Sequence, residues 1–375
     1  MRTTMRTTMT WMRTLFAAAA AATLATPALA DSFPGSRPIE MTVLFPAGSS
    51  ADVSARLLAD GMSKRLGVKV FVVNRPGAGG AIGYKYAAEQ KPDGHALVWN
   101  SNSISTTYYA GTLPFTYSRF EPVAQVLVES PVLAVSKDSP WKTLADVIAA
   151  AKAKPATLTI ANSGAGSHTH ISSVALFKTA KTDVVNVPFG AAQLVPALLG
   201  HQIDAALQLP AALTGYVRTG DLRLLATLTD KRDPAFPDVP TAREQGVDVS
   251  LEAWRGIAVP KGTPKKVVAQ LEAAIKETVA SPEFQQGCEK LGARPAFASS
   301  VVFGRTIARQ DVQLARLMET IGLNIRGKHA ELEPSQPAHH AEAEKPEHLV
   351  HHVRRPGFMG RIWHTPDFQT SQASQ

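Results

Sequence analysis

From residue 39 onward, short β-rich segments alternate along the chain with amphipathic segments of helical period. The first pair is IEMTVLF (39–45), expected to be a buried strand, and 51–67, whose apolar residues share one helical face and which ends at Gly67. Strands that alternate with helices are typical of parallel α/β sheets, because a parallel neighbour is reached through a crossover helix. The alternation therefore predicts the α/β class.

The same alternation continues to about residue 322. Further strands are expected at 68–74, 95–100, 131–136, 158–163, 184–189, 203–209, 222–229 and within 251–264. Further helices are expected at 81–90, 143–154, 169–180, 191–200, 264–292 with a break at Ser281-Pro282, and 299–322. A chain of 375 residues, 45% of them hydrophobic, is long enough for one large or two medium domains.

Both ends of the chain differ in composition from the middle. Residues 1–30 carry three Arg and no acid before the apolar run LFAAAAAATLATPALA, which ends in a small-x-small pattern typical of a cleavable secretory signal. We therefore expect an exported protein whose mature chain begins near Asp31. Residues 326–375 hold seven of the eleven His and lose apolar periodicity, so we expect a disordered tail.

Charge and cysteine content limit the kinds of ligand and cross-link that are expected of this protein. The formal net charge is +8, and removal of the three Arg of the expected signal leaves +5 (36 Lys+Arg against 31 Asp+Glu). These charges are scattered, so nothing indicates a nucleic-acid partner, although a mildly basic chain suits an anionic ligand. Cys288 is the only cysteine, which excludes an internal disulfide, and we expect it to be a core residue.

Three turns of small residues each connect an expected strand to an expected helix: FPAGSSADVSAR (45–56), GAGGAIG (77–83) and NSGAGSH (162–168). The N-terminus of a helix presents unpaired backbone N–H groups and a partial positive charge, which together stabilise an anion. Ser49 or Ser50 is suited to cap the first helix, with Asp52 in the position of a capping-box acid. In an open α/β sheet such turns gather at the carboxyl ends of strands, where ligands bind.

Other chemistries fit these turns less well. GAGGAIG departs from the dinucleotide pattern Gly-x-Gly-x-x-Gly at Ile82, and neither a P-loop nor a Gly-x-Ser-x-Gly elbow occurs. Ser167 with His168 or His170 leaves an exported hydrolase open as an alternative, although adjacency does not make a catalytic pair. The His-rich tail leaves weak binding of Zn²⁺, Ni²⁺ or Cu²⁺ as a second alternative.

Taken in order, these motifs resemble the solute-binding receptors of tripartite tricarboxylate transporters, the Bug-type receptors. The family pattern is matched by NRPGAGGAIG (74–83), by KPDGHAL with His95 in place of Tyr, and by EAWRGIAVPKGTP (252–264). The resemblance covers about 38–324. It implies a type II periplasmic-binding-protein fold, in which two α/β domains close on a ligand in the cleft between them. We place these domains at 31–130 plus 254–325 and at 131–253.

The resemblance also implies a function: a monomeric periplasmic receptor, not an enzyme, that captures a small carboxylated organic acid. It would deliver this acid to membrane transporter subunits or to a sensor, with no cofactor or metal in the site. The residues carried over from the family are Ala47, Gly48, Ser49, Ser50 and Asp52 on one wall, Ser101 and Asn102 on the floor, Gly164, Ala165, Gly166, Ser167 and His168 on the opposing wall, and Phe189 and Gly190 at its flank.

Two positions depart from the family pattern. Many members carry an Asp where this chain has Gln208, positioned to meet an amino group or the far end of the ligand. A neutral Gln at this position favours a ligand with a second carboxylate or a neutral polar end over a ligand with an amino group. Ala47 stands where the family usually has Gly, and a positive φ at that position would strain the turn.

Overall fold

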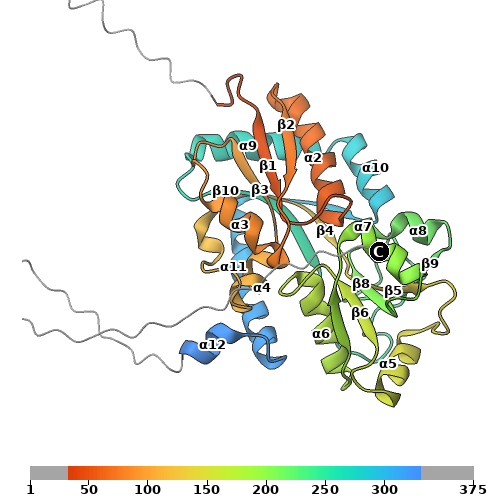
Figure 1. Cartoon of the computed structure of the whole chain (residues 1–375). Coiled ribbons are helices and arrows are strands. Elements are labelled where there is room, and N and C mark those ends of the chain that lie inside the picture. The colour runs from red at the N-terminus through yellow and green to blue at the C-terminus, as the bar shows by residue number, and fades with distance from the viewer. Residues whose placement is uncertain (1–32, 331–375) are drawn as a thin grey trace, which may run out of the picture. The chain divides into compact units, whose positions relative to one another are not determined.

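Two mixed sheets organise the part of the chain that this computed structural model describes, residues 33–330 (Figure 1). The first sheet contains β1 (Ile39–Val43), β2 (Val70–Asn74), β3 (Ala96–Ser101), β4 (Phe120–Glu129), β10 (Ala253–Pro260) and β11 (Arg294–Ser299), in the order β11-β4-β10-β3-β1-β2. The second contains β5 (Val132–Ser136), β6 (Thr159–Asn162), β7 (Val185–Pro188), β8 (Ala205–Gln208) and β9 (Leu222–Thr227), in the order β7-β6-β8-β5-β9.

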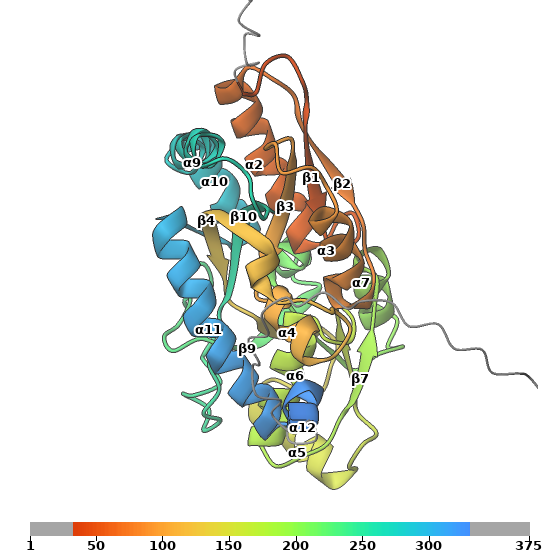
Figure 2. The same ribbon diagram turned by 90° about the vertical axis from the view of Figure 1, so that its left-hand side faces the viewer.

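Helices accompany both sheets. With the first sheet are α2 (Ser50–Leu66), α3 (Ala81–Ala88), α4 (Ser103–Tyr109), α9 (Lys265–Val279), α10 (Pro282–Leu291) and α11 (Ser300–Thr320). With the second are α5 (Leu144–Ala153), α6 (His168–Thr179), α7 (Ala191–Leu199) and α8 (Thr214–Arg218). Figure 2 shows α9, α10 and α11 along one side of the first sheet, and α9 and α11 both contact β4.

The prediction of parallel sheets was correct for half of each sheet. β1 is parallel to β2 and β3, and β6 is parallel to β7 and β8. It was wrong for β10, which is antiparallel to β3 and β4, and for β5, which is antiparallel to β8 and β9. The reason is that β5 and β10 are each entered from the other sheet, so no crossover helix imposes a parallel direction on them.

The chain passes between the sheets twice. β4 ends at Glu129 in the first sheet and β5 begins at Val132 in the second, whereas the return path runs from the end of β9 to Ala253. The described residues form one compact unit by their contacts, so the division into domains at 31–130 plus 254–325 and 131–253 stays a prediction. No helix among the described residues is both long and apolar enough to cross a membrane.

Most predicted elements are present, and some were missed. The break at Ser281-Pro282 is confirmed, because the Ser281 side chain accepts from the Phe284 N–H and caps α10. No element was predicted for α4, α8, β4 or β11. The expected signal at 1–30 lies outside the described residues, as does the expected tail, except that 326–330 form part of a helix, α12 (Ile325–Ala330), rather than disordered chain.

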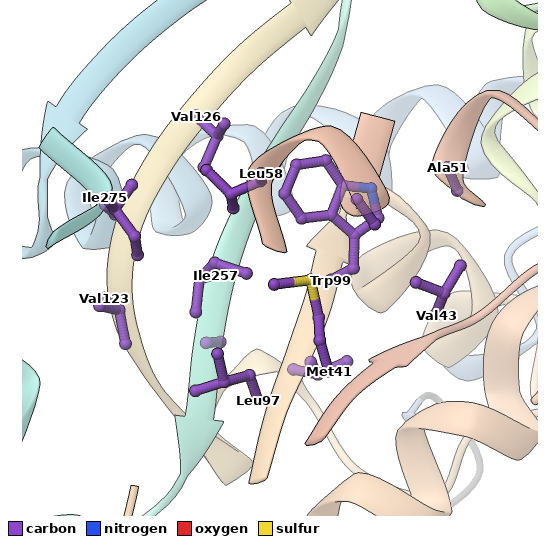
Figure 3. Close-up of a cluster of buried hydrophobic side chains, with 14 of the residues drawn as sticks. Met41, Val43, Ala51, Leu58, Leu97, Trp99, Val123, Val126, Ile257 and Ile275 are labelled. Carbon is purple, nitrogen blue, oxygen red and sulfur yellow. The ribbon is translucent and has the colours of Figure 1, made fainter. Parts of the chain in front are cut away.

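The core of the first sheet holds most of the largest fully buried side chains of the described chain. Trp99 and Met41 project from neighbouring strands toward Leu58 and Ile257, as Figure 3 shows, and all four are fully buried. Cys288 belongs to the same cluster, where burial raises the pKa of its thiol to about 12. The expectation that Cys288 is a core residue is therefore confirmed.

Candidate ligand-binding site

A cavity of about 510 Å³ is lined by residues of both sheets and their turns. From the first-sheet side, the predicted site residues Ser49, Ser50 and Ser101 line it. From the second-sheet side, the predicted residues that line it are Gly164, Ala165, Ser167, His168, Phe189, Gly190 and Gln208. The structure therefore brings together in one cavity two turns that are more than one hundred residues apart in sequence.

Five predicted residues do not line the cavity: Ala47, Gly48, Asp52, Asn102 and Gly166. Four of them, Gly48, Asp52, Asn102 and Gly166, instead make hydrogen bonds within or between the turns and their neighbours. The Asn102 side chain accepts from the Trp254 N–H at 2.8 Å and donates to Gln310 at 2.7 Å, and the Gly166 carbonyl accepts from the Thr106 hydroxyl at 2.6 Å.

Asp52 organises the first turn and does not line the cavity. Its carboxylate accepts from the Gly48 N–H at 3.0 Å, from Asn74 at 2.9 Å and from the side chain of Arg56 at 3.0 Å. Burial alone would raise the pKa of Asp52, but these hydrogen bonds outweigh it and lower the pKa below its usual value. The positive φ of the turn falls on Gly48 (78°), and Ala47 is not among the residues with positive φ, so the departure at Ala47 causes no strain.

The N-terminus of α2 presents free backbone donors to the cavity. Of the two caps that the sequence left open, Ser49 is the one used, its hydroxyl accepting from the Asp52 N–H at 3.3 Å, and Ser50 is the first residue of the helix. The N–H groups of Ser50 and Ala51 have no hydrogen-bond acceptor among the described residues, and both residues line the cavity. This is the pattern expected of the first helical turn, where no preceding carbonyl is available.

The N-terminus of α6 repeats this arrangement from the second-sheet side. Ser167 caps the helix by accepting from the His170 N–H at 3.2 Å. The N–H groups of His168 and Thr169 have no acceptor among the described residues, and both residues line the same cavity. Two helix ends, each with two free N–H groups and a partial positive charge, therefore open onto one space.

The third Gly-rich turn also reaches the cavity, although none of its residues was among the predicted site residues. Residues 76–80 line it, with Gly79 at a φ of 65°. A Cβ at Gly79 would lie 2.4 Å from the Ala165 carbonyl oxygen and 2.9 Å from the Ser167 nitrogen. A glycine is therefore required where this turn packs against the backbone of the turn before α6.

The histidines of that turn are not paired with its serine. The Nε2 of His168 donates to the Leu251 carbonyl at 2.9 Å, so its Nδ1 carries no proton and has no partner among the described residues. Burial lowers the pKa of His168 to about 4 and also lowers that of His170, whose Nδ1 accepts from the Gly166 N–H. Among the described residues, neither ring is hydrogen bonded to the Ser167 hydroxyl, which instead contacts the Thr169 hydroxyl at 3.2 Å and the His170 N–H.

Sequence reasoning missed a buried charged pair at the cavity. Arg255 of β10 lines the cavity, and its Nε donates to Oε2 of Glu129 at 3.0 Å. The signal available in the sequence was an Arg within the otherwise apolar strand AWRGIAVP. No group of three or more His, Cys, Asp or Glu that could hold a metal occurs among residues 33–330, and the expected metal-binding tail lies largely outside them.

Two mixed α/β sheets with a cavity between them, bounded by helix N-termini, define the class: the type II periplasmic-binding-protein fold. The comparisons with known proteins identify the family. Residues 54–323 match the model of the tripartite tricarboxylate transporter family receptor. The chain therefore belongs to this family of solute-binding receptors, as the resemblance implied.

Individual relatives agree with this assignment. The chain is 34% identical over 287 residues to Protein BugT of Bordetella pertussis, covering 75% of this chain and 87% of BugT. It is similar to the solved structure of the periplasmic binding protein BugD, with a TM-score of 0.73 and 30% identity over 77% of this chain and 98% of BugD. A structure of R. palustris Rpa4515 with adipate has a TM-score of 0.74 and 26% identity over 77% of this chain and 98% of that one.

Proposed function

We propose that this protein is a non-catalytic periplasmic receptor that binds a small organic acid by its carboxylate and delivers it to membrane transporter subunits. The observation that carries the proposal is the pair of helix N-termini, α2 and α6, whose four free N–H groups open onto one cavity. A carboxylate offers several lone pairs to such donors, and both helix dipoles stabilise its charge.

The chemistry of the remaining wall agrees with an acid and argues against an amino acid. Within the described chain, no Asp or Glu lines the cavity to receive an ammonium group. Gln208 stands at the position where many relatives have Asp, and its side chain is hydrogen bonded to Ser163 at 2.9 Å. The adipate bound by the related R. palustris protein is itself a carboxylate ligand without an amino group.

Contacts between the two sides of the cavity support a clamp. The Thr106 hydroxyl, from the first-sheet side, donates to the Gly166 carbonyl, and Gly79 packs on the same turn. We therefore propose that the two predicted domains separate to admit the acid and close on it, a shift between open and closed populations. A monomer exported by a signal at 1–30 fits this role.

The test is a thermal-shift screen of the mature protein against mono-, di- and tricarboxylates and amino acids. A ligand that binds only the folded state stabilises it by about 2.7 kcal/mol at one hundred times its dissociation constant. We expect a shift with at least one acid that is absent in the double variant Ser49→Ala/Ser167→Ala. No shift with any acid, together with a shift with Zn²⁺ or Ni²⁺ that is lost when 331–375 are removed, would instead support the metal alternative.

A further inference from the structure

A buried ion pair forms part of the cavity wall. Arg255 has only 5% of its side chain exposed, and Glu129, the last residue of β4, is fully buried. Besides the contact with Arg255, Glu129 accepts a hydrogen bond from the Ser50 hydroxyl. Ser50 is the first residue of α2, so the pair is tied directly to one of the helix ends that we propose for the carboxylate.

The guanidinium of Arg255 keeps two of its three nitrogens free. Within residues 33–330, neither Nη1 nor Nη2 donates to an acceptor, and neither is a buried polar atom cut off from both partner and solvent. Because Arg255 lines the cavity, these N–H groups open into it. Two parallel donors on a planar fork match the two oxygens of a carboxylate.

The pair is difficult to explain by stability alone. Burying both charges costs desolvation free energy that their mutual attraction often does not recover. Apolar residues of similar size would therefore stabilise the core at least as well. Arg255 is the sole Lys, Arg, Asp or Glu among the described residues that line the cavity, and Glu129 lies behind it. In this position Glu129 and Ser50 fix the guanidinium so that its free edge faces the ligand.

We infer that Arg255 anchors a second anionic group of the ligand, with Glu129 and Ser50 as positioning residues. The ligand is then a dicarboxylate, with one carboxylate at the N-termini of α2 and α6 and the other on Nη1 and Nη2 of Arg255. This inference rests on the proposed function, because it takes the first carboxylate site as given.

Calorimetric titration with succinate, glutarate and adipate, each against its monomethyl ester, tests the inference. The ester keeps the chain length and removes one charge. We expect the best diacid to bind wild-type protein at least about tenfold more tightly than its ester, the value of a charged hydrogen bond. Arg255→Gln should abolish this preference and leave the affinity for the ester within about threefold.

The control is Arg223→Gln, which removes the same charge from a side chain that donates to the Trp141 and Lys137 carbonyls and does not line the cavity. It should leave both affinities unchanged. If Arg255→Gln fails to fold because Glu129 is left buried without its partner, Glu129→Gln/Arg255→Gln removes both charges and takes its place in the same titration.

Three results would overturn the inference and leave the receptor for a carboxylate standing. Wild-type protein could bind diacid and ester equally, or the preference could survive in the variants. Alternatively, Arg255→Gln could weaken diacid and ester by the same factor, which would assign Arg255 to the first carboxylate. If wild-type protein bound neither diacid nor ester, the proposed function itself would fail, and this inference with it.

Discussion

Ser49 has two roles that a matched substitution can separate. It caps α2 and places its hydroxyl at the cavity, whereas Ser281 caps α10 through Phe284 and does not line the cavity. We expect Ser49→Ala and Ser281→Ala each to lower the free energy of unfolding by about 1 kcal/mol, measured by urea denaturation. In titrations with the acid found in the screen, only Ser49→Ala should weaken binding. Equal binding by both variants would show that the Ser49 hydroxyl does not contribute to carboxylate binding.

His168 makes stability depend on pH with a defined sign. The pKa of His168 in the folded state is about 4, below its ordinary value of 6.5, because the ring is buried, so the unfolded chain takes up the proton first as pH falls. The stability that the neutral His168 ring contributes is fully present above pH 6.5 and is lost progressively as the pH falls toward 4. We expect the free energy of unfolding of wild-type protein to fall by about 2 kcal/mol more than that of His168→Gln between pH 7.5 and pH 5.

Urea denaturation of both proteins at the two pH values measures this difference. His170 also has a lowered pKa, and it is unchanged in both proteins, so its contribution cancels in the comparison. Parallel pH profiles for wild-type protein and His168→Gln would show that His168 does not carry the effect.

Single residues also show how far the sequence could predict the site. A cap at Ser49 or Ser50 follows from local spacing, which a sequence displays directly, whereas the site position of Ser167 came from the family resemblance. The roles of Asp52 and Asn102 do not, because each is decided by partners that are distant in the chain, such as Asn74 for Asp52. Arg255 was missed for the same reason, since its partner Glu129 lies 126 residues away.

At the scale of elements, the Gly-rich turn before α3 controls how closely the two sides of the cavity approach. An Ala at position 79 would bring its Cβ into the backbone of 165–167, whereas Gly262, at a φ of 91°, has open space around it. We expect Gly79→Ala and Gly262→Ala each to lower the free energy of unfolding by about 1–2 kcal/mol, because alanine is strained in the left-handed backbone conformation.

Acid binding separates these two glycine variants. Only Gly79→Ala should weaken it, by about tenfold or more, because its methyl group holds the turns apart. Calorimetry with the same acid measures the affinities, and urea denaturation measures the loss of stability that both variants share. If Gly79→Ala bound as tightly as Gly262→Ala, the contact between the turns would have no part in closure.

Elements were predicted well where local hydrophobic periodicity determines the secondary structure, and poorly where pairing within a sheet determines it. α2 and α9 carry clear helical patterns, and both lie within a residue or two of the expected bounds. β4 was not predicted, although it lies between β10 and β11 in the first sheet. Its sequence, FEPVAQVLVE, contains a Pro and two Glu, and its strand conformation depends on pairing with β10.

For the whole molecule, two crossings of the chain place turns from distant segments at one cavity. The three small-residue turns at 45–50, 76–80 and 163–169 all reach it. The sequence predicted that such turns gather at the carboxyl ends of strands, and the family resemblance supplied the second sheet. Composition and spacing alone could not show that two sheets, rather than one, carry these turns.

A crystal structure of the protein with the tightest acid from the screen would show directly where the carboxylate binds. We expect carboxylate oxygens about 3 Å from the backbone nitrogens of Ser50 or Ala51 and of His168 or Thr169 at the same time. A carboxylate bound elsewhere in the cavity, or in contact with only one of the two helix ends, would contradict it.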